Sequence, residues 1–118
     1  MSDFHLILQK ARQNHSGHHN IYVVQLNKKA KKKFGYLNED SGHPVVYVGL
    51  TGLTPSERFE KHKNNDKAGK GYVRDYGVSL LPHLYEEYNP SPYELAKKAE
   101  GALADKLRAD GYTVLGGH

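Results

Sequence analysis

Three side chains of types that can take part in catalysis or ligand binding follow a short strand-like segment in the middle of the chain. In VVYVGLTGLTPSERFEKH, the strand end at Tyr47 precedes a helix-like segment with Arg58 and His62 four residues apart, on one helical face. Glu100 lies at the rim of the apolar arc of a later helix, where its carboxylate can face a cleft between helix and sheet. An arginine fork binds anionic oxygens, and a carboxylate can hold a hard divalent cation. The plain alternative is a set of solvated surface residues.

The segments that must position these side chains have local signals of their own. NIYVVQL (20–26) and VVYVGL (45–50) are rich in β-branched and aromatic residues, which predicts two strands. TPSE (54–57) is a capping box with proline at the first helical position, which predicts a helix to about residue 65. SPYE (91–94) repeats this pattern and predicts a helix that Gly111 ends.

The remaining segments complete a small domain. Residues 1–19 predict an amphipathic helix and a His-rich loop, and 27–44 predict a long basic connection between the two strands. VSLLPHLY (78–85) predicts a third strand, at a sheet edge or with a bulge because of Pro82, and YTVL (112–115) a short strand or an extended tail. The expected fold class is α/β (α+β): a mostly antiparallel sheet of about three strands flanked by helices, with 20–118 as the body of a single domain.

Composition narrows the function classes. The chain has 118 residues, a formal net charge of +4 and a pI of about 9.2, which favours an anionic partner such as nucleic acid. It has no cysteine, so disulfides, thiolate metal sites and cysteine nucleophiles are excluded. The apolar run near the N-terminus is too short for a signal peptide or a membrane span, so we expect a soluble, cytoplasmic protein without membrane contact.

The order of these motifs resembles that of the GIY-YIG nuclease superfamily. Asn20-Ile21-Tyr22 stands for the first motif and Tyr47-Val48-Gly49 for the second, followed by Arg58, His62 and Glu100 in order. The resemblance covers residue 20 to about residue 115. It implies an endonuclease, dependent on Mg²⁺ or Mn²⁺, that hydrolyses phosphodiester bonds of DNA or possibly RNA. With no added recognition domain, its sequence specificity is expected to be low, or supplied by a protein partner.

The resemblance also implies a role for each side chain. Tyr22 would accept the proton of the attacking water, and His62 would take that proton onward, because a neutral phenol is a weak base near pH 7. Tyr47 would orient a water or the phosphate. Arg58 would bind phosphate oxygens, and Glu100 would hold the metal ion.

A second group of residues is expected to contact the substrate. Gly49 and Thr51 follow the second tyrosine directly, and a lysine run lies between the two strands. Lysines on a mobile loop would contact phosphates without reading bases, and the alternative is a solvated loop without function. The lysines are Lys28, Lys29, Lys31, Lys32 and Lys33.

Departures from the family pattern keep other functions open. Eighteen residues separate the two strands where the family has a short connection, and Leu50 stands where some members have lysine. The closing segment lacks the asparagine of many members, so Thr113 or His118 replaces it or the site is built differently. The main alternative is a catalytically inactive nucleic-acid-binding module, and a third is a module that binds an acidic protein. His15, His18 and His19 form either a polar loop or a metal site.

Overall fold

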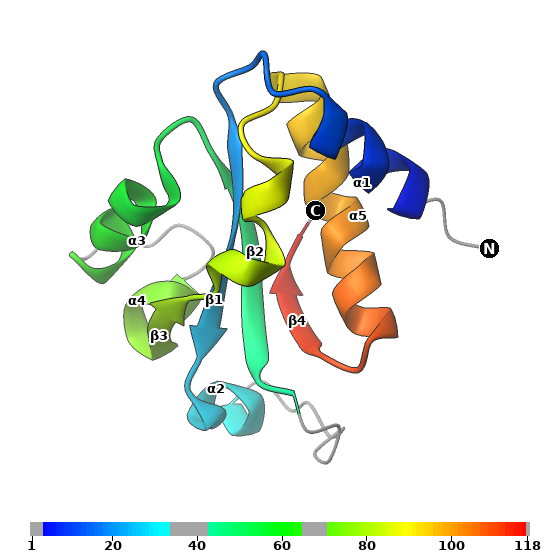
Figure 1. Ribbon diagram of the computed structural model, residues 1–118. Coiled ribbons are helices and arrows are strands. Elements are labelled where there is room, and N and C mark those ends of the chain that lie inside the picture. The colour runs from blue at the N-terminus through cyan, green and yellow to red at the C-terminus, as the bar shows by residue number, and fades with distance from the viewer. Residues whose placement is uncertain (1–3, 34–42, 65–70, 118) are drawn as a thin grey trace.

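Four strands form one mixed sheet, in the order β3-β1-β2-β4, with helices on both of its faces (Figure 1). The computed structural model describes residues 4–33, 43–64 and 71–117. The strands are β1 (Asn20–Leu26), β2 (Val45–Thr51), β3 (Gly77–Leu80) and β4 (Thr113–Gly116). The helices are α1 (Phe4–Gln13), α2 (Lys28–Lys33), α3 (Pro55–Lys63), α4 (Tyr72–Tyr76) and α5 (Tyr93–Ala109), and the short 3-10 segments are η2 (Pro82–Leu84) and η3 (Glu86–Tyr88).

The predicted α/β class is confirmed, and the sheet has one strand more than expected. β1 pairs antiparallel with both β2 and β3, as a mostly antiparallel sheet requires. The closing segment is β4, which pairs parallel to β2. A parallel partner needs a crossover that returns the chain to the same end of the sheet. The whole chain from α3 to α5 makes that return.

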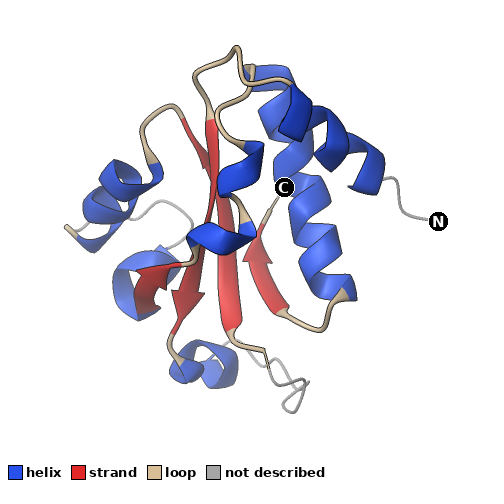
Figure 2. Ribbon diagram, in the orientation of Figure 1, coloured by secondary structure: helices blue, strands red, loops and turns tan. Residues whose placement is uncertain are grey.

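The two central strands are covered on both faces. Consecutive residues of a strand point to opposite faces, yet Ile21, Tyr22, Val23 and Val24 are all buried. Figures 1 and 2 show the reason: α3 and α4 lie on one side of the sheet, and α1 and α5 lie on the other. The continuous apolar run of β1 is therefore the pattern of a strand between two helical layers.

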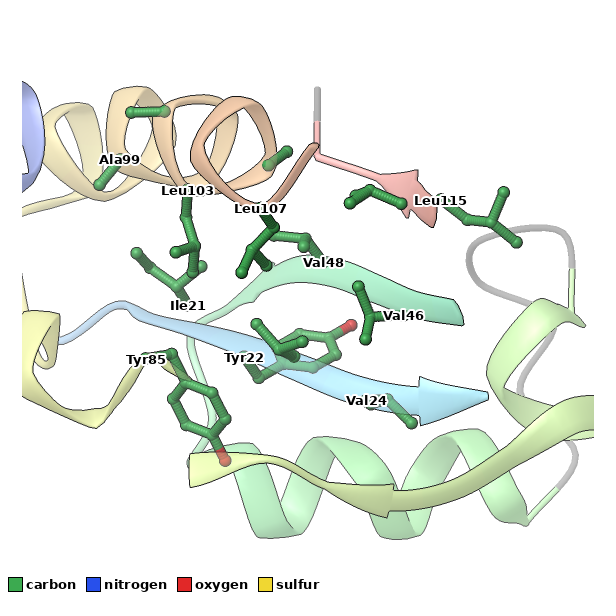
Figure 3. Close-up of a cluster of buried hydrophobic side chains, with 14 of the residues drawn as sticks. Ile21, Tyr22, Val24, Val46, Val48, Tyr85, Ala99, Leu103, Leu107 and Leu115 are labelled. Atoms are coloured by element: carbon green, nitrogen blue, oxygen red, sulfur yellow. The ribbon is translucent and has the colours of Figure 1, made fainter. Parts of the chain in front are cut away.

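The core on the α5 side comes from the apolar arc predicted for the last helix. Leu103 and Leu107 of α5 face Ile21 of β1 and Val48 of β2 (Figure 3). The predicted N-terminal amphipathic helix is confirmed as α1, whose buried Leu8 and Ala11 face inward, and α1 packs along α5. Gly111 ends α5 with φ of +99°, a left-handed conformation that glycine adopts without a Cβ clash.

The predicted second capping box is wrong. The N-cap residue of α5 is Pro92, and no side chain caps the helix. The Ser91 hydroxyl instead donates to the carbonyl of Tyr88 at 2.8 Å, and the Ser91 backbone forms an antiparallel bridge with His19. The bridge holds the backbone of Ser91 extended, and the residue is buried. Its hydroxyl is bonded to Tyr88 and therefore does not cap the helix.

The basic connection and the third strand also differ from the expectation. Lys28–Lys33 form α2, so the lysine run lies on a helix rather than a loop, while residues 34–42 lie outside the described part of the chain. β3 is an edge strand as predicted, but it ends at Leu80, and Pro82 begins η2. Within the described ranges, no helix has the length and apolar character needed to cross a membrane.

Candidate active site

The two motif tyrosines share one face of the sheet. In the antiparallel register, Tyr22 lies opposite Gly49, and Tyr47 lies opposite Val24. Directly opposed residues share a face, and so do residues two apart on one strand. The two rings are therefore diagonal neighbours, with centroids 6.2 Å apart. A register slip of one residue would turn one hydroxyl to the other face.

Gly49 makes room for the ring of Tyr22. A Cβ built on Gly49 would lie 2.5 Å from the Tyr22 hydroxyl oxygen and 2.8 Å from its Cε1, distances that van der Waals radii forbid. The glycine of the Tyr47-Val48-Gly49 motif is thus a packing requirement: the Tyr22 phenol lies directly against the β2 backbone. Its predicted contact with a substrate stays a prediction.

Helix α3 brings Arg58 and His62 to this face. The predicted capping box is confirmed, because the Thr54 hydroxyl accepts from Glu57 N at 3.1 Å and the Glu57 carboxylate accepts from Thr54 N at 3.0 Å. This cap fixes where the helix starts, and hence which face turns to the sheet. His62 is fully buried, and its Nε2 is hydrogen-bonded to the Tyr22 hydroxyl at 2.9 Å.

Arg58 and Glu100 interact electrostatically with the same tyrosines. Burial raises the pKa of Tyr22 well above its ordinary value, nearby Tyr47 raises it further, and a hydrogen bond with Arg58 lowers it. Burial likewise raises the pKa of Tyr47, and the negative charge of Glu100 raises it further. Arg58 and a hydrogen bond with Tyr22 lower this pKa. Both phenols are therefore neutral in the resting site at pH 7. The structure brings Tyr22, Tyr47 and His62 into contact, and the charges of Arg58 and Glu100 act on the two phenols. The catalytic roles of all five stay predictions.

Glu100 is the carboxylate of this cluster. It lies half-buried on α5, and burial raises its pKa to about 7, against the opposing charge of Lys97. In the described part of the chain, no group of three or more His, Asp or Glu side chains is placed to hold a metal ion. Mg²⁺ keeps several waters and is commonly bound through one or two carboxylates together with substrate phosphates. The donor set present, one partly desolvated carboxylate, fits such an ion.

Apart from Gly49, the predicted substrate contacts whose side chains the structure describes are Thr51, Lys28 and Lys29. Thr51 is buried at the end of β2, where its hydroxyl accepts from Leu53 N at 3.0 Å and shapes the turn into α3. Lys28 and Lys29 are exposed on α2, which follows the opposite end of β1. Lys28 lines a cavity of about 320 Å³ there, away from the tyrosines. The side chains of residues 31–33 lie outside the described ones.

Thr113, one candidate for the missing asparagine, lies away from the tyrosines. Thr113 pairs with Val45, at the far end of β2, and His118 lies outside the described residues. Gly116 is the residue that approaches Tyr47: a Cβ there would lie 2.9 Å from the Tyr47 ring. Two of the three histidines of the loop before β1 have structural partners: His15 Nδ1 is 3.0 Å from the Pro90 carbonyl oxygen, and the His19 ring packs edge-on against Tyr93.

Sequence reasoning missed Tyr72 as a member of the cluster. Its ring meets that of Tyr47 edge-on, with centroids 6.4 Å apart. Tyr72 belongs to α4, a helix of five residues, which is too short for hydrophobic periodicity to indicate a buried face. The only available signal was the density of tyrosine in this part of the chain.

Comparisons with protein-family models, with curated proteins and with solved structures found no match to this chain. The resemblance to the GIY-YIG nucleases therefore depends on the residues themselves and on the arrangement described above.

Proposed function

We propose that the protein is a GIY-YIG-type endonuclease that hydrolyses phosphodiester bonds of DNA, or of RNA, with Mg²⁺ or Mn²⁺. The observation that carries the proposal is the buried hydrogen bond between the Tyr22 hydroxyl and His62 Nε2, with Tyr47 6.2 Å away. A tyrosine that only packs in a sheet needs no buried imidazole at its hydroxyl, because burying polar groups costs free energy. Arg58 and Glu100 add charges of both signs to this network.

Each side chain supports one part of phosphodiester hydrolysis. Arg58 carries a permanent positive charge and can bind phosphate oxygens as negative charge develops on them. The phenols and His62 form a hydrogen-bonded path that can receive a proton from water. Glu100 would hold the divalent ion, which acts as a Lewis acid toward phosphate and lowers the pKa of bound water.

The charge of the protein fits an anionic polymer. The chain carries a formal net charge of +4, and the exposed Lys28 and Lys29 of α2 can contact phosphates along the backbone. Such contacts add affinity without reading bases, so we propose low intrinsic sequence specificity, or specificity gained from a protein partner.

The main alternative is a nucleic-acid-binding module without catalysis. The observation in its favour is that β4 brings glycine to Tyr47, whereas Thr113, a candidate for the family's closing asparagine, lies at the other end of β2. A site with glycine at that place could still bind nucleic acid through Arg58 and the lysines.

Cleavage of supercoiled plasmid tests the proposal directly. The protein should relax or linearise the plasmid when Mg²⁺ or Mn²⁺ is present, and EDTA should stop the cleavage. Glu100→Gln should abolish cleavage, whereas Glu94→Gln, on the exposed first turn of the same helix, should retain it. Binding without cleavage of any DNA or RNA would support the inactive module. Cleavage by Glu100→Gln at the wild-type rate would refute the assignment of Glu100.

A further inference from the structure

The two phenols of the site differ in their access to water. Tyr22 is 2% exposed and His62 is fully buried, whereas Tyr47 is only half-buried. The attacking water must lie at a phosphate of a large polymer, and such a polymer can reach only the surface. Exposure therefore favours Tyr47 as the phenol that meets the water.

Hydrogen bonding gives an independent reason. A tyrosine hydroxyl has one hydrogen and two lone pairs. The Tyr22 hydroxyl has His62 Nε2 at 2.9 Å, and Arg58 and Tyr47 interact with it as well. A water molecule at Tyr22 would compete with these partners.

Packing closes the other approaches to Tyr22. Its ring lies so close to Gly49 that a methyl group would not fit between them. The ring of His62 lies across from both phenols, with centroids 6.0 Å from each. Tyr47 has the Tyr72 ring edge-on at 6.4 Å, but unlike Tyr22 it keeps part of its side chain exposed to solvent.

We propose that Tyr47 is the phenol that takes the proton of the attacking water, and that Tyr22 is a buried positioning residue that passes a proton from Tyr47 to His62. The assignment rests on the proposed function and reverses the roles that the family resemblance implies for the two tyrosines. As the water oxygen bonds to phosphorus, one water proton moves to Tyr47, the Tyr47 proton to Tyr22, and the Tyr22 proton to His62 Nε2. The P–O bond to the leaving oxygen breaks with its electron pair, and solvent protonates that oxygen.

Fluorine NMR tests the exposure of each phenol without any need for activity. A single 3-fluorotyrosine is placed at position 47 or 22, and the ¹⁹F shift is compared between H₂O and D₂O. Position 93, which is 48% exposed, and position 85, which is 3% exposed, serve as references. Position 47 should show a solvent shift approaching that of position 93, and position 22 one close to that of position 85. A larger solvent shift at position 22 than at position 47 would overturn the proposal.

Chemical rescue tests the order of proton transfer. Tyr47→Ala and Tyr22→Ala should each lose about 10²-fold or more in kcat, the usual contribution of acid–base catalysis. Added phenol should restore cleavage to Tyr47→Ala, because the vacated space opens to solvent, and should not restore Tyr22→Ala. Rescue of Tyr22→Ala alone would refute the order. If the wild-type protein cleaves nothing, the proposed function and the role of Tyr47 in it are both wrong, while the fluorine shifts still decide which phenol meets water.

Discussion

The half-buried carboxylate of Glu100 should make the stability of the protein depend on pH. Burial raises its pKa from 4.5 to about 7, so the folded protein holds a proton that the unfolded chain releases above pH 4.5. The folded state is thus favoured below pH 4.5, and this advantage is lost as pH rises to 7. At about 1.4 kcal/mol per pKa unit the full effect is about 3 kcal/mol. Residual contact of Glu100 with water reduces our expectation to about 2 kcal/mol.

Urea unfolding in EDTA measures this effect. Glu100→Gln stays neutral, so at pH 8 it should be more stable than the wild-type protein by about 2 kcal/mol, and at pH 4.5 the two should be nearly equal. Glu60→Gln, at an exposed position on α3, is the matched control and should leave the pH dependence of stability unchanged. An identical pH dependence in Glu100→Gln and the wild-type protein would refute the burial of Glu100. It would also remove the argument that a desolvated carboxylate at this position favours binding of a cation.

Three further outcomes follow from the packing and charge described above. Gly49→Ala should lower the free energy of unfolding by about 1–3 kcal/mol in urea titrations, because its Cβ overlaps the Tyr22 ring, whereas Gly52→Ala, whose Cβ meets nothing closer than 3.7 Å, should change it by less than about 0.5 kcal/mol. Thr54→Ala should cost about 1 kcal/mol through loss of the confirmed cap, and an unchanged unfolding midpoint would show that the cap does not support α3. Replacing Lys28 and Lys29 with alanine should reduce the slope of log affinity for DNA against log salt by about 0.9 for each phosphate that these lysines neutralise in the wild-type complex; an unchanged slope would show that α2 does not touch nucleic acid.

Local sequence determined the elements that hold the site. β-branched and aromatic runs specify β1 and β2, because such side chains suit a pleated and buried surface. The Thr54 box specifies the start of α3, since its two hydrogen bonds form between residues three apart. The i, i+4 spacing of Arg58 and His62 then sets their common face. These features depend on neighbours along the chain, so sequence reasoning could predict them.

Pattern reasoning failed where a tertiary contact competed with a local signal. Ser91 begins a sequence typical of a capping box. Its backbone instead bridges to His19, and its hydroxyl bonds to the carbonyl of Tyr88. The lysine run has the composition of a loop, yet it forms a helical turn after β1. Rules based on neighbouring residues cannot predict a backbone bridge such as the one between Ser91 and His19, which lie far apart in the sequence.

The sequence by itself determined which side chains were available: two strand tyrosines, an arginine and a histidine on one helical face, and a glutamate at the rim of another helix. Only the tertiary structure decided how they meet. Strand register placed Tyr22 against Gly49, and the packing of α3 buried His62 next to the Tyr22 hydroxyl. The physical reason is that burial and register are set by all elements packing at once, so the different exposure of Tyr22 and Tyr47, two tyrosines in similar strands, cannot be seen in either strand alone.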